Sequence, residues 1–184
     1  MLKLIHVCDM NFENVLEYYN SFAVNGYKDI NNFAITLVKE GKEKYYDWIT
    51  TYEKGMYYLV DSSNENYIIG YGNIEDSEIL DYHKDYLNIG NIGYGVRPNE
   101  RNKGYGTRIL ELLLLKCEEN GMSEVCVSCE KGNIPSQKII LKHNGIFEKE
   151  FYDDFEGPGL KYWIKLKPKL SNKIHRLVKM NSCK

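Results

Sequence analysis

The residues whose types and spacing most clearly suggest ligand binding lie between Asn91 and Gly106, where a short basic loop containing glycines precedes an apolar stretch. Arg101 and Lys103 supply positive charge, and the glycines let a ligand approach the backbone closely. A loop that leads directly into a helix also leaves the first amides of that helix without intrahelical acceptors, and the helix dipole adds partial positive charge there. This combination predicts a binding site for a phosphate or a similar anion.

The same stretch also has a simpler interpretation, an ordinary strand-to-helix turn with solvated basic side chains. A Gly-x-Gly pair in front of a helix is weak evidence by itself. The spacing of the glycines matches neither the dinucleotide-binding fingerprint nor the Walker phosphate loop. The Walker loop also requires a Lys-Ser or Lys-Thr pair, and none follows Gly106. The flanking residues are therefore needed to choose between the two interpretations.

Those flanks carry a family resemblance. Arg101 to Gly106 (Arg-Asn-Lys-Gly-Tyr-Gly) resembles the Arg/Gln-x-x-Gly-x-Gly/Ala signature of the GNAT superfamily of acyl-CoA-dependent N-acetyltransferases. Val96 to Pro98 stands where the exit of that family's fourth strand is expected, and Asn133 to Gly145 resembles its fourth helix. Lys161 to Ile164 is similar to the ending of a poorly characterised bacterial subgroup of acetyltransferases, and the whole resemblance extends from about Met56 to Leu166.

The resemblance implies acetyl-CoA as the cosubstrate and assigns the parts that hold it. The backbone of Tyr94 and Val96 would meet the thioester and the pantetheine arm, with the Tyr94 N–H as the oxyanion donor. Asn133 would hydrogen-bond the CoA arm, and Ser136 would pack beside it. The pyrophosphate would be bound by the backbone amides and basic side chains of Arg101, Asn102, Lys103, Gly104, Tyr105, Gly106 and Thr107.

The expected reaction is direct transfer of the acetyl group to a primary amine within a ternary complex. A base or water chain must remove the amine proton, and the candidates are Glu130, then Glu75 and His83. A non-catalytic CoA-binding sensor or scaffold is the alternative, and a phosphate-loop protein for another nucleotide is a third hypothesis.

One departure from the family concerns the general acid. Many members carry a tyrosine seven residues after the helix-4 asparagine, where it protonates the departing thiolate, and Ile140 stands at that position here. Ser136, Tyr152 or a bound water are the substitutes that the sequence leaves open. The missing tyrosine also agrees with the sensor alternative. The acceptor stays open among small-molecule amines and peptide amines, including polyamines, antibiotics, amino acids and protein amino termini, and the family allows a homodimer.

The elements around these residues predict a mixed α/β (α+β) fold in one domain over residues 1–167. The resemblance gives a mostly antiparallel sheet of about six to seven strands with helices on both faces. The strand-helix-strand unit across residues 87–129 implies that strands 4 and 5 are parallel. Strands are expected at 2–7, 56–60, 67–74, 87–96, 124–129, 146–152 and 160–166, and helices at 12–23, in pieces within 33–54, and at 107–119 and 135–143. Residues 168–184 form a basic tail, with a short terminal helix at most.

Composition narrows the function classes. The net charge of −2 argues against nucleic acid as a partner, and the apolar run from Ile109 to Leu115 is too short to cross a membrane. The odd count of 5 cysteines and the lack of a signal peptide predict a reducing, cytoplasmic setting. Cys126 and Cys129 form a Cys-x-x-Cys, but on a strand they face opposite sides, so we expect packing cysteines and no metal.

Overall fold

The computed structural model describes residues 1–24, 36, 38–52, 55–75, 90–153 and 157–167. The strands are β1 (Leu2–His6), β2 (Met56–Asp61), β3 (Gly70–Ile74), β4 (Ile92–Val96), β5 (Glu124–Glu130), β6 (Ile146–Asp153) and β7 (Gly157–Lys165). The helices are α1 (Phe12–Val24), α3 (Lys42–Tyr52), α5 (Tyr105–Glu119) and α6 (Ile134–Lys142). None of the described helices combines the length and apolar character needed to cross a bilayer.

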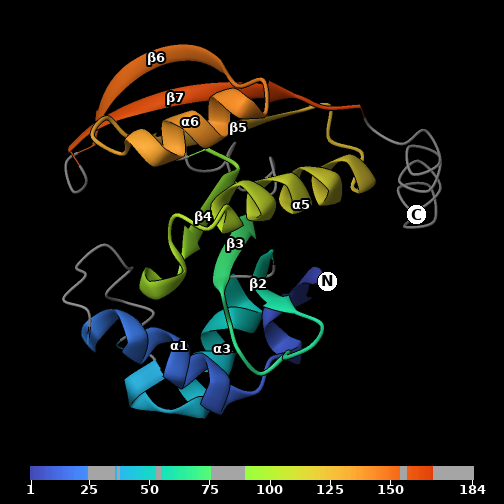
Figure 1. Cartoon of the computed structure of the whole chain (residues 1–184), viewed down its shortest axis with the longest axis vertical. Coiled ribbons are helices and arrows are strands. Elements are labelled where there is room, and N and C mark those ends of the chain that lie inside the picture. Colours follow the sequence, from blue (N-terminus) through green and yellow to red (C-terminus); the bar gives the residue numbers. More distant parts are fainter. Residues whose placement is uncertain (25–35, 37, 53–54, 76–89, 154–156, 168–184) are drawn as a thin grey trace, which may run out of the picture. The chain divides into compact units, whose positions relative to one another are not determined.

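The strands form a 7-stranded mixed sheet with the order β1-β2-β3-β4-β5-β7-β6, flanked by helices (Figure 1). β4 and β5 run parallel, with Ile92 opposite Val127. β1 pairs antiparallel with β2, β2 with β3, β5 with β7, and β6 with β7. The predicted mixed fold class and the parallel strand 4/strand 5 pair are both confirmed.

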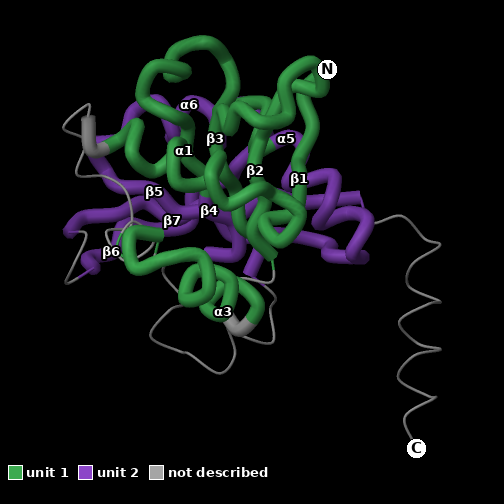
Figure 2. Tube along the Cα trace, turned by 90° about the horizontal axis from the view of Figure 1, so that it is seen from below, with its two compact units in different colours: residues 1–73, 94–110 green, residues 74–93, 111–184 purple. Residues whose placement is uncertain are grey.

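The chain divides into two compact units, coloured separately in Figure 2. Unit 1 contains residues 1–73 and 94–110, and unit 2 contains residues 74–93 and 111–184. β4 and α5 each contribute residues to both units, because the divisions fall between Gly93 and Tyr94 and between Leu110 and Glu111.

Aromatic side chains dominate the core of unit 1. Tyr18 and Phe22 from α1, Tyr45 and Ile49 from α3, and Tyr58 from β2 are all buried. The spacing of four residues in each helix directs both members of a pair to the same face. Tyr18 meets Phe22 and Tyr58 edge-on at ring-centroid distances of 5.2 and 5.7 Å. The hydroxyls of Tyr45 and Tyr58 are 2.6 Å apart and satisfy each other, so these large rings are buried without leaving either hydroxyl unpaired.

Unit 2 is built on the long antiparallel pairing of β5 with β7, which runs from Glu124 opposite Lys165 to Glu130 opposite Gly159. Val125 and Val127 of β5 are fully buried. β6 pairs with the other edge of β7 and is mostly exposed. This hairpin and α6 form the C-terminal part of the described chain.

Several boundaries differ from the sequence prediction. α5 begins at Tyr105 rather than Thr107, and α6 begins at Ile134 rather than Pro135 because the Asn133 side chain caps it. The strand predicted over 87–96 is confirmed only as β4, and β3 is shorter than the predicted 67–74. The predictions for residues 76–89, including His83, and for the tail at 168–184 lie outside the described residues.

Candidate active site

The loop between β4 and α5 lies in unit 1 and is built from unusual backbone conformations. Pro98–Glu100 form a single turn of 3-10 helix, and two of the next residues are left-handed, Asn102 with φ 64° and Gly104 with φ 85°. A side chain is costly in this conformation, which glycine adopts freely and asparagine tolerates. The chain then enters α5 directly at Tyr105. Two left-handed residues only two positions apart change the direction of the chain sharply within the loop.

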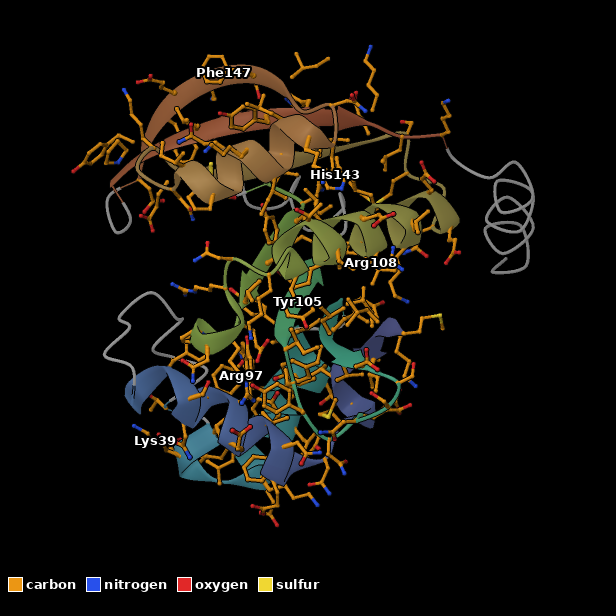
Figure 3. The ribbon with its side chains drawn as sticks, viewed as in Figure 1. Lys39, Arg97, Tyr105, Arg108, His143 and Phe147 are labelled. Carbon is orange, nitrogen blue, oxygen red and sulfur yellow. The ribbon has the colours of Figure 1, made fainter. Side chains whose placement is uncertain are left out.

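The start of α5 has the features of an anion site. Helix geometry leaves its first amides without intrahelical acceptors, and the Arg108 N–H is the amide that closes the first turn, donating to the Gly104 carbonyl at 3.2 Å. Gly106 is buried, and Tyr105 and Arg108 extend from the first turn (Figure 3). The dipole of an α-helix that continues to Glu119 adds partial positive charge at this end.

The basic side chains of the loop are held by neighbours within unit 1. Arg101 donates from Nε to the Val96 carbonyl at 3.3 Å. Lys103 forms an ion pair with Glu100 at 3.0 Å, and this hydrogen bond raises the pKa of the lysine, so it stays charged at neutral pH. The Lys103 side chain is 53% exposed and thus remains accessible to a ligand.

The backbone of β4 carries the residues predicted to meet a thioester. Tyr94 and Val96 are both half-buried. A Cβ at Gly95 would lie 2.4 Å from the Tyr71 ring, and a Cβ at Gly90 would lie 2.7 Å from the Cys126 carbonyl oxygen. At these two positions, therefore, the group that approaches the glycine closely belongs to the protein itself.

The second group of predicted residues lies in unit 2, at the start of α6. Asn133 caps the helix, since its Oδ1 accepts a hydrogen bond from the Ser136 N–H at 3.1 Å. Ser136 also hydrogen-bonds the Cys129 thiol, whose pKa is raised overall because burial outweighs that bond. Capping uses the oxygen of the Asn133 amide, and its Nδ2 group is the donor of the same side chain.

Ile140 shows what replaced the tyrosine that many family members carry. Its side chain is fully buried, and a Cβ on Gly145 would lie 2.4 Å from Ile140 Cγ2. The position therefore anchors the end of α6. Tyr152, one of the substitutes considered above, is 72% exposed on β6.

The candidate bases have different surroundings. Glu130 is exposed at the end of β5, and its carbonyl accepts the Asn133 N–H at 3.0 Å. Glu75 follows β3 and exchanges hydrogen bonds with Asn91 through its backbone. The structure thus brings Glu130 close to Asn133 within unit 2, joins Glu75 to the start of β4, and does not describe His83.

Sequence reasoning missed the residues that support the loop. Arg97 is buried and pairs with Glu17 of α1, and the Tyr67 hydroxyl donates to Glu100 at 3.0 Å. Glu17 and Arg97 are 80 residues apart, and although Arg97 lies in the Val96 to Pro98 segment that carries the family resemblance, nothing in that segment predicts Glu17 as its partner. A buried arginine next to the loop could have been suspected only from its position directly after the apolar strand.

A comparison with protein-family models identifies the class of protein to which this fold belongs. A family model described as "Acetyltransferase (GNAT) domain" matches residues 2–145, and the chain belongs to this family. Membership implies acyl transfer with an acyl-CoA cosubstrate. The comparison with curated proteins finds no match.

Solved structures share the fold at low sequence identity. A GNAT-family acetyltransferase from Bacillus anthracis is 16% identical with a TM-score of 0.60, covering 89% of this chain and 94% of that one. An N-acetyltransferase from Staphylococcus aureus Mu50 is 17% identical with a TM-score of 0.59, covering 91% and 98%. A spermidine N-acetyltransferase chimera of SpeG from Vibrio cholerae and hSSAT is 13% identical with a TM-score of 0.63, covering 90% and 94%.

Proposed function

We propose that this protein is an N-acetyltransferase that moves an acetyl group from acetyl-CoA to a primary amine. The observation that carries the proposal is the loop from Arg101 to Gly106, which passes through two left-handed residues and leads directly into α5. Its amides and the helix dipole suit a pyrophosphate, and Arg101 and Lys103 add charge for the phosphate oxygens. Family membership supports CoA as the owner of that pyrophosphate.

Each predicted residue then has a role in holding the cosubstrate. The backbone amides from Asn102 to Thr107 bind the pyrophosphate, while the backbone of Tyr94 and Val96 meets the thioester and pantetheine. Asn133 donates from Nδ2 to the pantetheine arm, since its Oδ1 is already used to cap α6. Ser136 packs beside that arm.

The chemistry follows from this arrangement. The neutral amine nitrogen attacks the thioester carbonyl carbon, and the Tyr94 N–H stabilises the oxyanion of the tetrahedral intermediate. The C–S bond then breaks, CoA leaves as its thiolate, and the amine proton passes to a base, for which Glu130 is the first candidate and Glu75 and His83 are the others. Because a thiol has a pKa of about 8.5, the thiolate is a competent leaving group near neutral pH, and a protein acid at position 140 is dispensable.

A non-catalytic CoA-binding protein is the second candidate, favoured by one specific observation. Ile140 is committed to packing, so the usual proton donor is absent. The two functions differ in turnover: both predict CoA binding, and only the enzyme releases free CoA when an amine is supplied.

The test compares wild-type protein with two glycine variants. Gly104→Ala adds a side chain at φ 85° in the loop, and Gly121→Ala adds one at φ 79° just after the C-terminal end of α5. Neither new Cβ would lie within 4 Å of another atom. Both variants therefore lose about 1–2 kcal/mol of stability through backbone strain. Only Gly104→Ala should also weaken CoA binding measured by calorimetry, by about tenfold or more, because it changes the ligand-binding backbone.

Turnover is measured as CoA thiol release with a panel of a polyamine, an amino acid, an aminoglycoside and a peptide amino terminus. Release with any of them supports the enzyme, and tight CoA binding without release supports the sensor. Equal CoA affinity in the Gly104→Ala and Gly121→Ala proteins would contradict the assignment of the loop. Stabilisation by a nucleoside triphosphate but not by CoA would overturn the proposed function as a whole.

A further inference from the structure

Arg97 is a buried charged side chain directly before the loop. It is 3% exposed, and its two terminal nitrogens donate to the two carboxylate oxygens of Glu17 at 2.8 and 2.5 Å. Burial works to lower the pKa of Arg97, but the hydrogen bonds and charge of Glu17 outweigh it, so the pKa lies above its usual value. Such a two-point pair fixes both the position and the orientation of the guanidinium. Arg97 extends toward α1 (Figure 3).

Two tyrosine rings hold the same guanidinium. Its central carbon lies 4.1 Å from the centroid of the Tyr67 ring and 5.4 Å from that of Tyr18. Both distances fall within the range of a cation–π interaction. Arg97 is therefore fixed by a carboxylate and by two aromatic rings, all within unit 1.

Tyr67 continues the network into the loop. Its ring contacts Arg97, and its hydroxyl donates to Glu100 Oε1 at 3.0 Å. The other oxygen of the same carboxylate, Oε2, accepts from Lys103 Nζ at 3.0 Å. Tyr67 thus links the buried arginine at the end of β4 to the basic residue in the middle of the loop.

The loop gains order from this support. Asparagine tolerates the left-handed region better than other non-glycine residues, so the conformation is accessible at Asn102, and contacts around it select that conformation. Asn102 is in that region, between Glu100 and Lys103, and its own side chain is exposed. The network holds the backbone on both sides of Asn102.

We propose that Tyr67 and Glu17 are positioning residues, which act through Glu100 and Arg97 to hold the loop in its CoA-binding conformation. This inference rests on the proposed function. A loop that is already ordered loses less conformational entropy when it binds a pyrophosphate, so the network raises affinity without touching the ligand. The benefit is confined to the phosphate-bearing part of CoA.

The experiment removes one hydroxyl at a time. Tyr67→Phe keeps the ring on Arg97 and loses the hydroxyl that bonds Glu100 and Arg97. The control Tyr46→Phe loses a hydroxyl that donates to the Met10 carbonyl at 2.6 Å in the same unit. The affinity of each protein for CoA is measured by calorimetric titration. The affinity for pantetheine, which lacks the pyrophosphate, is measured from its displacement of bound CoA. Thermal unfolding without ligand records the general loss of stability in each variant.

We expect Tyr67→Phe to weaken CoA binding by about fivefold to tenfold, with pantetheine binding unchanged within about twofold. Tyr46→Phe should leave both affinities unchanged. Glu17→Gln should repeat the Tyr67→Phe pattern, against the control Glu40→Gln, which loses only an exposed ion pair with Lys44 at 2.9 Å.

Two results would overturn the inference. One is equal CoA affinity in the Tyr67→Phe and Tyr46→Phe proteins, and the other is a parallel loss of CoA and pantetheine binding, which would indicate a general structural role. If wild-type protein fails to bind CoA, the proposed function itself falls, and the two failures are therefore distinguishable.

Discussion

Cys126 and Cys117 illustrate how burial controls chemistry at the scale of a residue. Burial raises the pKa of the Cys117 thiol to about 12 and that of Cys126 to about 11, since a thiolate loses hydration in an apolar environment. Cys8, by contrast, is exposed. The thiolate is the nucleophile in alkylation, so reactivity follows exposure and pKa together.

This difference predicts a selective pattern of alkylation. With iodoacetamide on folded protein between pH 7 and pH 9, we expect Cys8 to be modified and Cys117 and Cys126 to stay unmodified, because raised pKa values keep their thiols protonated throughout that range. Peptide mapping by mass spectrometry measures each site. Modification of Cys126 at a rate close to that of Cys8 would refute the interpretation of Cys126 as a packing residue, and alkylation after denaturation in urea provides the control for full reactivity.

At this scale, the sequence allowed prediction of functional residues that are neighbours in the chain, but not of those that only tertiary structure brings together. Arg101 to Gly106 was recognisable because the spacing of its basic residues and glycines reflects a local backbone geometry. The pairing of Arg97 with Glu17 depends on tertiary structure that brings together positions 80 residues apart, and a single charged residue on a helix normally indicates a solvated face. The same limit applied to Tyr67, one of 16 tyrosines in the chain.

At the scale of elements, β4 depends on a side chain where it approaches β5. Asn91 is 4% exposed, and its Oδ1 accepts the backbone N–H of Cys126 at 2.9 Å. Its Nδ2 donates to the Glu75 carbonyl at 3.3 Å, and its own N–H donates to the Cys126 carbonyl at 2.7 Å. Asn91 therefore joins the start of β4 to β5 and to the end of β3.

Asn91→Ala should lower the free energy of unfolding by about 1–3 kcal/mol, because it leaves the buried Cys126 N–H without an acceptor. The control Asn120→Ala removes an exposed amide just beyond α5 and should cost less than about 0.5 kcal/mol. Urea titration followed by circular dichroism measures both. A loss in Asn91→Ala no larger than that of the control would indicate that water or a shifted backbone group replaces the amide.

The elements with strong periodic patterns were predicted best. α5 was found because its apolar residues recur at helical spacing, although its first turn was missed, since Tyr105 and Gly106 lack that pattern. β4 begins at Ile92 although the predicted strand included residues 90 and 91, because a sequence pattern does not indicate where hydrogen-bonded pairing begins. The prediction for residues 87–89 lies outside the described part of the chain. α6 begins at Ile134 because the Asn133 side chain caps it by accepting a backbone N–H. The predicted start relied on Pro135 as the first helical residue and did not take this cap into account.

At the scale of the whole molecule, the two compact units are interleaved along the chain. Unit 1 needs residues 94–110 in addition to residues 1–73, and unit 2 needs residues 74–93 in addition to those from 111 onward. β4 and α5 have residues in both units, so neither element can unfold without disturbing the two together. We therefore propose that residues 1–167 form a single cooperative domain, as the sequence predicted.

The two tryptophans allow this proposal to be tested, because Trp48 lies in α3 of unit 1 and Trp163 lies in β7 of unit 2. Trp163→Phe leaves a fluorescence probe in unit 1, and Trp48→Phe leaves one in unit 2. Within each variant, the urea midpoint from fluorescence should coincide with the midpoint from circular dichroism, the behaviour of a two-state domain. Comparing midpoints inside one variant removes the effect of each substitution on stability, including loss of the Trp163 hydrogen bond to Glu148 at 2.7 Å. A fluorescence transition that precedes the circular dichroism transition in one variant and follows it in the other would mean that the units unfold separately, despite sharing β4 and α5.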